Sequence, residues 1–418
     1  MADRYQTPTA LDSTDDSTQN QQGTLLPAGL RDLMPAEARH QEMTTRCLLD
    51  CFAGFGYQRV KPPLVEFEET LIGQGPGAAL AADTFRMMDP VSRRMLALRA
   101  DMTAQIGRIA TSRLAHAARP LRLAYCGDIL RVTPDPLNPE RQLGQLGAEL
   151  VGCTSPMHDA EVAVLALEAL RRAGLEQLTI DLNAPGLVTL LLEQSGRPQS
   201  VAAMRRALSM KDQDATRQAA GPLADSFLGL LDMPFHSAVD APASLLEIAE
   251  TLPEPAAIML RQLASIADHI RQAADFATIT LDPLESRGFD YHTGFGFSIF
   301  APSIRGELGR GGRYRTASLV ASEKTDSSDG VSTTELATGV TLYMEPVLRG
   351  IARKPEPPLL YVPASVGLPG LLQQAASETD MVVVFGHPDA DSAALAAADA
   401  RALGASHIVL DGVIKLLD

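Results

Sequence analysis

A long helical stretch interrupts the strand-forming pattern in the middle of this chain. Between Leu178 and Asp282 the sequence is rich in Ala and Leu, and prolines mark the joints between its helices. Strands flank this stretch on both sides, so we expect an α+β domain built on a sheet, with a helical insertion at about 183–276. The expected strands lie at 121–130, 142–151, 178–182, 277–281, 294–300 and 305–308.

The remaining elements divide the chain into three regions. Residues 1–23 are rich in Asp, Ser, Thr and Gln, which predicts a disordered tail. The main domain spans 24–350. The last region, 351–418, begins with a proline-rich linker and continues with short apolar strands and Ala-rich helices, which predicts a small α/β unit. Within the main domain we expect helices at 36–51, 102–115, 159–173 and 339–348, a proline-interrupted strand at 57–66, a hairpin at 84–98 and a flexible loop at 323–335.

The net charge and the cysteine spacing disfavour several classes of function. The chain has 36 basic and 51 acidic residues and a formal charge of −15, which disfavours a large nucleic-acid footprint. No Cys-x-x-Cys pair occurs among its four cysteines, so neither a zinc site nor a redox motif is predicted. No secretory signal and no apolar run of membrane-spanning length is present, and we expect a cytoplasmic protein without metal or cofactor.

Two motifs in the second half of the chain point to a family. They are Ser286-Arg287-Gly288-Phe289-Asp290-Tyr291-His292-Thr293-Gly294 and Gly309-Arg310-Gly311-Gly312-Arg313-Tyr314. They resemble the Arg-Gly-Leu-Asp-Tyr-Tyr and Gly-Gly-Arg-Tyr-Asp runs that line the amino-acid pocket of class II histidyl-tRNA synthetases. The resemblance runs from about Leu26 to Gly350 and implies that family's antiparallel sheet flanked by helices. Alone, the glycines of 309–312 indicate close backbone packing beneath a pocket.

The resemblance also implies a histidine pocket. Asp101 lies in a segment similar to the family's Leu-Arg-Pro-Glu-Gly-Thr-Ala run and would receive the ligand's ammonium group. Strand alternation places Gln145 and Glu149 on one face, so that both can point into one cavity. Histidine needs an acceptor for its ammonium, an acceptor for an imidazole N–H and a cation for its carboxylate, which Asp101, Glu149 and Arg287 would supply. The predicted histidine-binding residues are Asp101, Thr103, Arg131, Gln145, Glu149, Arg287, Tyr291, His292 and Tyr314; His292 stands where the synthetases carry a second tyrosine.

The ATP site of the synthetases is incomplete in this sequence. Thr133 stands where the family's second motif has the acid that reads adenine, and Pro346 stands where the third motif has an arginine. Proline offers no donor and cannot replace a guanidinium, so we expect no adenylate formation. Pro63 corresponds to the proline of the family's dimer interface, which implies a homodimer.

A retained ligand pocket beside a lost ATP site resembles the regulatory subunits of ATP phosphoribosyltransferase. That resemblance implies a non-catalytic partner of the short-form catalytic chain, required for the first step of histidine synthesis and for its feedback regulation by histidine. One alternative is a divergent histidyl-tRNA synthetase. Another is a scaffold subunit whose pocket is a relic. No nucleic acid and no membrane is expected as a partner.

Overall fold

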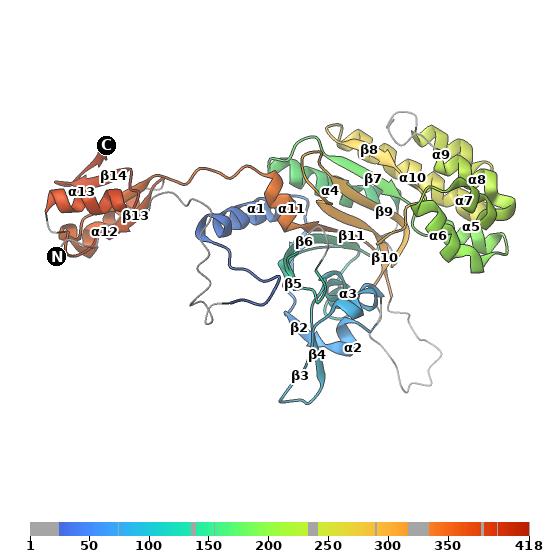
Figure 1. Ribbon diagram of the computed structural model, residues 1–418, viewed down its shortest axis with the longest axis horizontal. Coiled ribbons are helices and arrows are strands. Elements are labelled where there is room, and N and C mark those ends of the chain that lie inside the picture. The colour runs from blue at the N-terminus through green and yellow to red at the C-terminus, as the bar shows by residue number, and fades with distance from the viewer. Residues whose placement is uncertain are drawn as a thin grey trace, which may run out of the picture. The chain divides into compact units, whose positions relative to one another are not determined.

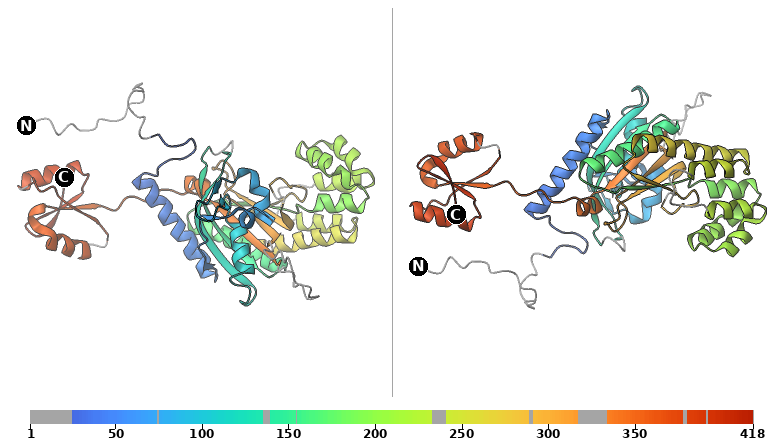
Figure 2. Two further views of the ribbon diagram at one scale, coloured as in Figure 1. Left: turned by 90° about the horizontal axis from the view of Figure 1, so that it is seen from below. Right: turned by 90° about the horizontal axis from the view of Figure 1, so that it is seen from above.

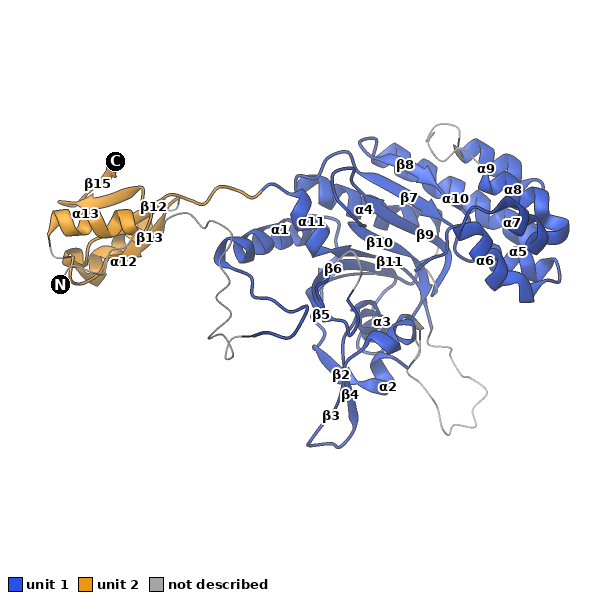
Figure 3. Cartoon of the chain, viewed as in Figure 1, with its two compact units in different colours: residues 1–352 blue, residues 353–418 orange. Residues whose placement is uncertain are grey.

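The computed structural model describes residues 25–417 except 74, 135–138, 154, 233–240, 289–290, 317–333, 378–379 and 391. The expected tail at 1–23 and most of the expected loop at 323–335 therefore lie outside the described residues. The chain forms two compact units, Met1–Ala352 and Arg353–Asp418 (Figure 3). No helix among the described residues is long and apolar enough to cross a membrane.

The larger unit is built on an eight-stranded sheet, in the order β1-β5-β6-β11-β10-β9-β7-β8 (Figures 1 and 2). The neighbours from β5 to β7 pair antiparallel, and only β1 with β5 and β7 with β8 pair parallel. The class of fold expected from the sequence, a mainly antiparallel sheet flanked by helices, is confirmed. The strands are β1 (Gln58–Arg59), β5 (Leu121–Leu130), β6 (Gln142–Val151), β7 (Thr179–Asn183), β8 (Thr278–Leu281), β9 (His292–Phe300), β10 (Gly309–Arg315) and β11 (Leu336–Tyr343).

Two predictions about the second half of the sheet were wrong. The expected strand at 305–308 does not form, and residues 309–315, for which no strand was predicted, form β10. Residues 336–343 form strand β11, and only a short helix α11 (Met344–Gly350) follows, where the sequence predicted a helix over 339–348. β11 is buried along nearly all its length, so its small, polar and apolar residues show no two-residue alternation that would distinguish it from a buried helix.

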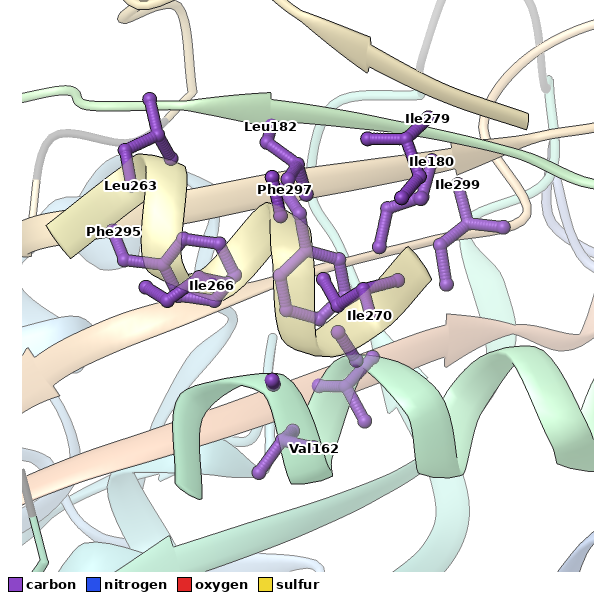
Figure 4. Packing of buried hydrophobic residues seen from close by; sticks show 14 of the residues in the cluster. Val162, Ile180, Leu182, Leu263, Ile266, Ile270, Ile279, Phe295, Phe297 and Ile299 are labelled. Carbon is purple, nitrogen blue, oxygen red and sulfur yellow. The ribbon is translucent and has the colours of Figure 1, made fainter. Parts of the chain in front are cut away.

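Helices cover one face of this sheet. Val162 on α4 (Pro156–Arg172) and Ile266 on α10 (Glu254–Ala273) pack with Leu182 of β7 and with Phe297 of β9 (Figure 4). These side chains are at most 1% exposed, and burying each large apolar group contributes roughly 1.5–3 kcal/mol. The expected hairpin is confirmed as β3 (Arg86–Met88) and β4 (Met95–Leu98), which form a separate three-stranded sheet with β2 (Val65–Phe67).

The helical insertion connects β7 to its parallel neighbour β8 (Figure 1). It consists of α5 (Leu187–Gln194), α6 (Val201–Ser209), α7 (Gln213–Ala220), α8 (Ala224–Leu231), α9 (Ala241–Ala249) and α10. Outside it, the larger unit also contains α1 (Pro35–Gly54), α2 (Glu68–Leu71) and α3 (Thr103–Thr111).

The smaller unit has its own four-stranded sheet, in the order β13-β12-β14-β15. The first three strands are parallel, and the expected α/β pattern of this region accounts for them. The fourth, β15, pairs antiparallel with β14 and was not expected. The elements are β12 (Leu359–Val362), α12 (Gly367–Ser377), β13 (Val382–Phe385), α13 (Ala393–Ala402), β14 (His407–Leu410) and β15 (Val413–Leu416).

Candidate functional site

The face of the large sheet opposite α4 and α10 carries polar side chains across neighbouring strands. In β6, Leu146, Ala148 and Leu150 belong to the core under the helices, so alternation turns Gln145 and Glu149 to the other face. Both are 1% exposed. The sequence expectation that these two side chains share one face therefore agrees with the structure.

These side chains meet the start of helix α3 in a network that we call the acidic cluster. The Gln145 side chain donates from Nε2 to Asp101 Oδ2 at 2.6 Å and accepts at Oε1 from the Met102 amide at 2.8 Å. Asp101 Oδ1 accepts from the amide of Thr103 at 2.6 Å, at the helix N-terminus where a carboxylate is favoured. The members of the acidic cluster are Asp101, Thr103, Tyr125, Gln145, Glu149, Tyr314 and Thr341.

Glu149 is the most deeply buried acid of this cluster. Its Oε2 accepts from the Tyr314 hydroxyl at 2.9 Å, and its Oε1 lies 3.4 Å from the Tyr125 hydroxyl. Burial raises the pKa of Glu149 to about 8, and the negative charge of Asp101 adds to the rise, although the Tyr314 hydrogen bond opposes it. A Cβ at Gly339 would lie only 1.7 Å from Oε2, so the carboxyl group needs a glycine beneath it.

The acidic cluster contains two carboxylates and no basic side chain. Among the described residues, no lysine or arginine forms an ion pair with Asp101 or Glu149. Glu149 is buried and Asp101 is half-buried, and acidic groups withdrawn from water without a cation are costly, so this arrangement favours a ligand that brings positive charge or N–H donors.

Aromatic rings border the cluster. Tyr291 stacks on His292 with ring centroids 4.2 Å apart, and it meets Tyr314 edge-on at 6.1 Å. His292 lies opposite Tyr314 in the β9–β10 pair and also lines a cavity of about 550 Å³ between β9 and helices α5 and α10. Burial raises the pKa of Tyr291 well above its usual value, and the negative charge of Asp101 adds to this rise. Tyr291 therefore adjoins the cluster through Tyr314, and His292 stacks on Tyr291 and lines the cavity beside α5 and α10.

The structure does not bring Arg287 into this cluster. Its side chain is 73% exposed and pairs with Glu285 at 2.6 Å, and it lines a separate cavity of about 340 Å³ with residues of the helical insertion. Arg287 thus lies apart from the other predicted residues in this structure. The backbone amides of Ser286 and Arg287 both donate to Glu285 Oε1, and Gly288 follows with a φ of +76°, so the local turn directs Arg287 outward.

Arg131, Thr133 and Pro346 belong to the region expected for ATP. Arg131 is half-buried just after β5, and its positive charge acts on the hydroxyl of Tyr343 at the end of β11. Thr133 is exposed, and Pro346 is buried in α11. Within the described ranges, no group of three or more His, Cys, Asp or Glu side chains could hold a metal ion.

Two members of the acidic cluster, Tyr125 and Thr341, were missed from the sequence, and so was the position of Arg310 beside them. The Tyr125 hydroxyl lies 2.9 Å from Thr341 Oγ1, and Arg310 lies directly opposite Thr341 in β10. Thr341 and Arg310 were missed because β10 and β11 were not predicted as strands. Strand alternation from Tyr314 backwards would have placed Arg310 on the same face.

Comparisons with known proteins agree with this architecture. The histidyl-tRNA synthetase family profile matches residues 29–347. An ATP phosphoribosyltransferase regulatory subunit of Rhodospirillum centenum is 40% identical over 392 residues, which cover 94% of this chain and 96% of that protein. A protein with the same description from Rhodospirillum rubrum is 41% identical over 93% of this chain and 95% of its own length.

Solved structures share the fold at lower identity. One, described as an ATP phosphoribosyltransferase regulatory subunit/histidyl-tRNA synthetase from Bacillus halodurans, has a TM-score of 0.74 and 21% identity and covers 93% of this chain and 98% of that one. A histidyl-tRNA synthetase from a Nostoc species has a TM-score of 0.72 and 16% identity, over 94% of this chain and 92% of that one.

Proposed function

Because this chain belongs to the family of ATP phosphoribosyltransferase regulatory subunits, which share the fold of histidyl-tRNA synthetases, we propose that its acidic cluster binds histidine. The chain is thus a non-catalytic regulatory subunit of the phosphoribosyltransferase in histidine biosynthesis. Histidine bound here would convey feedback inhibition to the catalytic chain. A sensor of this kind needs only a difference in ligand affinity between two states of the complex.

The observation that supports the proposal is the buried acid Glu149 in one network with the half-buried Asp101, neither paired with a basic side chain among the described residues. Histidine brings the complementary groups. Its ammonium group fits Asp101, which Gln145 holds in place, and its imidazole fits Glu149. With a pKa of about 8, Glu149 holds its proton at neutral pH and can share it with an imidazole nitrogen.

The decayed ATP site supports regulation over catalysis. Adenylate formation requires cations around the triphosphate, and Pro346 is a buried proline where the synthetases carry an arginine. Losing one such cation costs several kcal/mol of transition-state stabilisation, or roughly a thousandfold in rate. The second candidate, a divergent histidyl-tRNA synthetase, predicts histidine-dependent exchange between ATP and pyrophosphate, and the absence of exchange would remove it.

The assembly is part of the same proposal. The short-form catalytic phosphoribosyltransferase is the partner, and the chain forms a homodimer through the segment around Pro63 within that cytoplasmic hetero-oligomer. Pro63 and Leu64 are exposed, although the backbone carbonyl of Pro63 accepts a hydrogen bond from Gln105 at 2.8 Å. An exposed segment whose backbone is held by a hydrogen bond to the rest of the domain is suited to contact a second copy of this chain.

The decisive experiment is reconstitution. Catalytic chain and this chain are purified together, and phosphoribosyl transfer is measured alone and in the complex, with and without histidine. We expect stimulation by the complex, inhibition by histidine, and a Glu149→Gln variant that still stimulates but requires roughly ten- to a hundredfold more histidine for inhibition. Equal histidine sensitivity of variant and wild type would mean that histidine acts on the catalytic chain.

A further inference from the structure

An amino acid held by the acidic cluster needs a partner for its α-carboxylate, and we infer that Arg310, instead of Arg287, provides it. This inference rests on the proposed histidine site. A buried carboxylate is stabilised by charge-assisted hydrogen bonds, and an arginine offers its donors in a planar fork that matches a carboxylate. Each arginine pairs with a nearby glutamate at 2.6 Å, but the Arg287 side chain is 73% exposed and the Arg310 side chain only 24%.

The position of Arg310 in the sheet brings it beside the cluster. It lies directly opposite Thr341 in the antiparallel pair of β10 and β11. Side chains of directly opposite residues leave the sheet on the same face, about 5 Å apart. Thr341 Oγ1 lies 2.9 Å from the Tyr125 hydroxyl and 3.3 Å from Gln145 Nε2, so Arg310 is one strand away from Thr341 and two strands away from Gln145, which donates to Asp101.

Two tyrosines, Tyr291 and Tyr343, lie near one positive and one negative side chain, which are the two charges that complement a zwitterionic amino acid. Arg310 and Asp101 both act electrostatically on the hydroxyls of Tyr291 and Tyr343. The two hydroxyls are therefore close to a cation and to an anion at once. A zwitterionic ligand beside them would direct its ammonium group to Asp101 and its carboxylate to Arg310, and both ends would then be neutralised.

Existing contacts hold the guanidinium of Arg310 in place. Its Nη1 donates to the carbonyl of Gly288 at 2.9 Å, and its Nη2 donates to Glu307 Oε1 at 2.6 Å. A Cβ at Gly288 would lie 1.8 Å from Nη1, so the close approach requires glycine. A lysine cannot reproduce this fork, which predicts that Arg310→Lys keeps the charge but loses part of the carboxylate affinity.

The test uses the full chain and compares its affinity for a ligand that has a carboxylate with its affinity for one that lacks it. Calorimetry measures the binding of histidine and of histamine, which has the imidazole and the amine but no carboxylate, to wild type, Arg310→Gln and Arg287→Gln. We expect Arg310→Gln to weaken histidine binding roughly ten- to a hundredfold and histamine binding less than about threefold. Arg287→Gln should change the affinity for histidine less than about threefold. Arg310→Lys should give an intermediate loss that is again confined to histidine.

Each other outcome decides against the inference. If Arg287→Gln weakens histidine binding and Arg310→Gln does not, the carboxylate partner is Arg287, and the proposed histidine site still stands. If Arg310→Gln and Arg310→Lys each lose as much affinity for histamine as for histidine, Arg310 only supports the fold of the site. Wild-type protein that binds histamine as tightly as histidine would show that no cation reads the carboxylate. Wild-type protein that binds neither ligand would refute the histidine site, and Arg310 with it.

Discussion

The buried carboxyl of Glu149 should make the stability of this protein depend on pH between about 4.5 and 8. Its pKa is raised from 4.5 to about 8, mainly by burial, so the folded state binds a proton that the unfolded state has already released in this range. The contribution of Glu149 to the free energy of unfolding is therefore largest at low pH, and this contribution is lost as the pH rises to about 8. At about 1.4 kcal/mol per pKa unit, the loss between pH 6 and pH 9 is about 2.5 kcal/mol.

Glu149→Gln removes this titration and keeps an oxygen that can accept from Tyr314. Urea unfolding followed by far-UV circular dichroism at pH 6, 7, 8 and 9 gives the free energy of unfolding of variant and wild type. We expect the variant to gain about 2.5 kcal/mol relative to wild type from pH 6 to pH 9. Groups such as Asp282, with a pKa raised to about 6, are present in both proteins and cancel in the difference.

The matched control is Glu176→Gln, the same substitution at an exposed position. It should follow the wild-type curve within about 0.5 kcal/mol across the range. If the difference between Glu149→Gln and wild type stays constant from pH 6 to pH 9, Glu149 does not hold a proton at neutral pH. The proposed sharing of that proton with an imidazole would then be wrong.

Four further outcomes follow from the same geometry. Histidine affinity should fall above about pH 8 in wild type, and calorimetry should find a smaller fall in Glu149→Gln, because the free site then has no proton to lose. Gly339→Ala should destabilise the fold by about 1–3 kcal/mol in urea unfolding and weaken histidine binding, since its Cβ meets the Glu149 carboxyl, whereas Gly54→Ala, with open space around it, should do neither. Pro346→Arg should show no ATP–pyrophosphate exchange above a blank, because Thr133 still stands in the second motif. Sedimentation at micromolar concentration should give a dimer of the 44.6 kDa chain, and a strict monomer would contradict the interface assigned to Pro63.

The sequence by itself determined the parts of the site that depend on local order. The bounds of β5 and β6 agree with those expected. A side-chain period of two then fixed Gln145 and Glu149 on one face. The motif around Asp101 was sufficient to bring an acid to the start of α3.

Only the tertiary structure decided where the candidate arginines lie and how the charge of Glu149 behaves. Arg287 looked suitable in sequence, but Glu285 and the left-handed Gly288 direct it outward, which depends on a turn and not on periodicity. Arg310 lies opposite Thr341 because β10 pairs with β11, a pairing between strands that the sequence had not predicted. The raised pKa of Glu149 likewise comes from burial by residues far apart in the chain, since desolvation depends on packing in three dimensions.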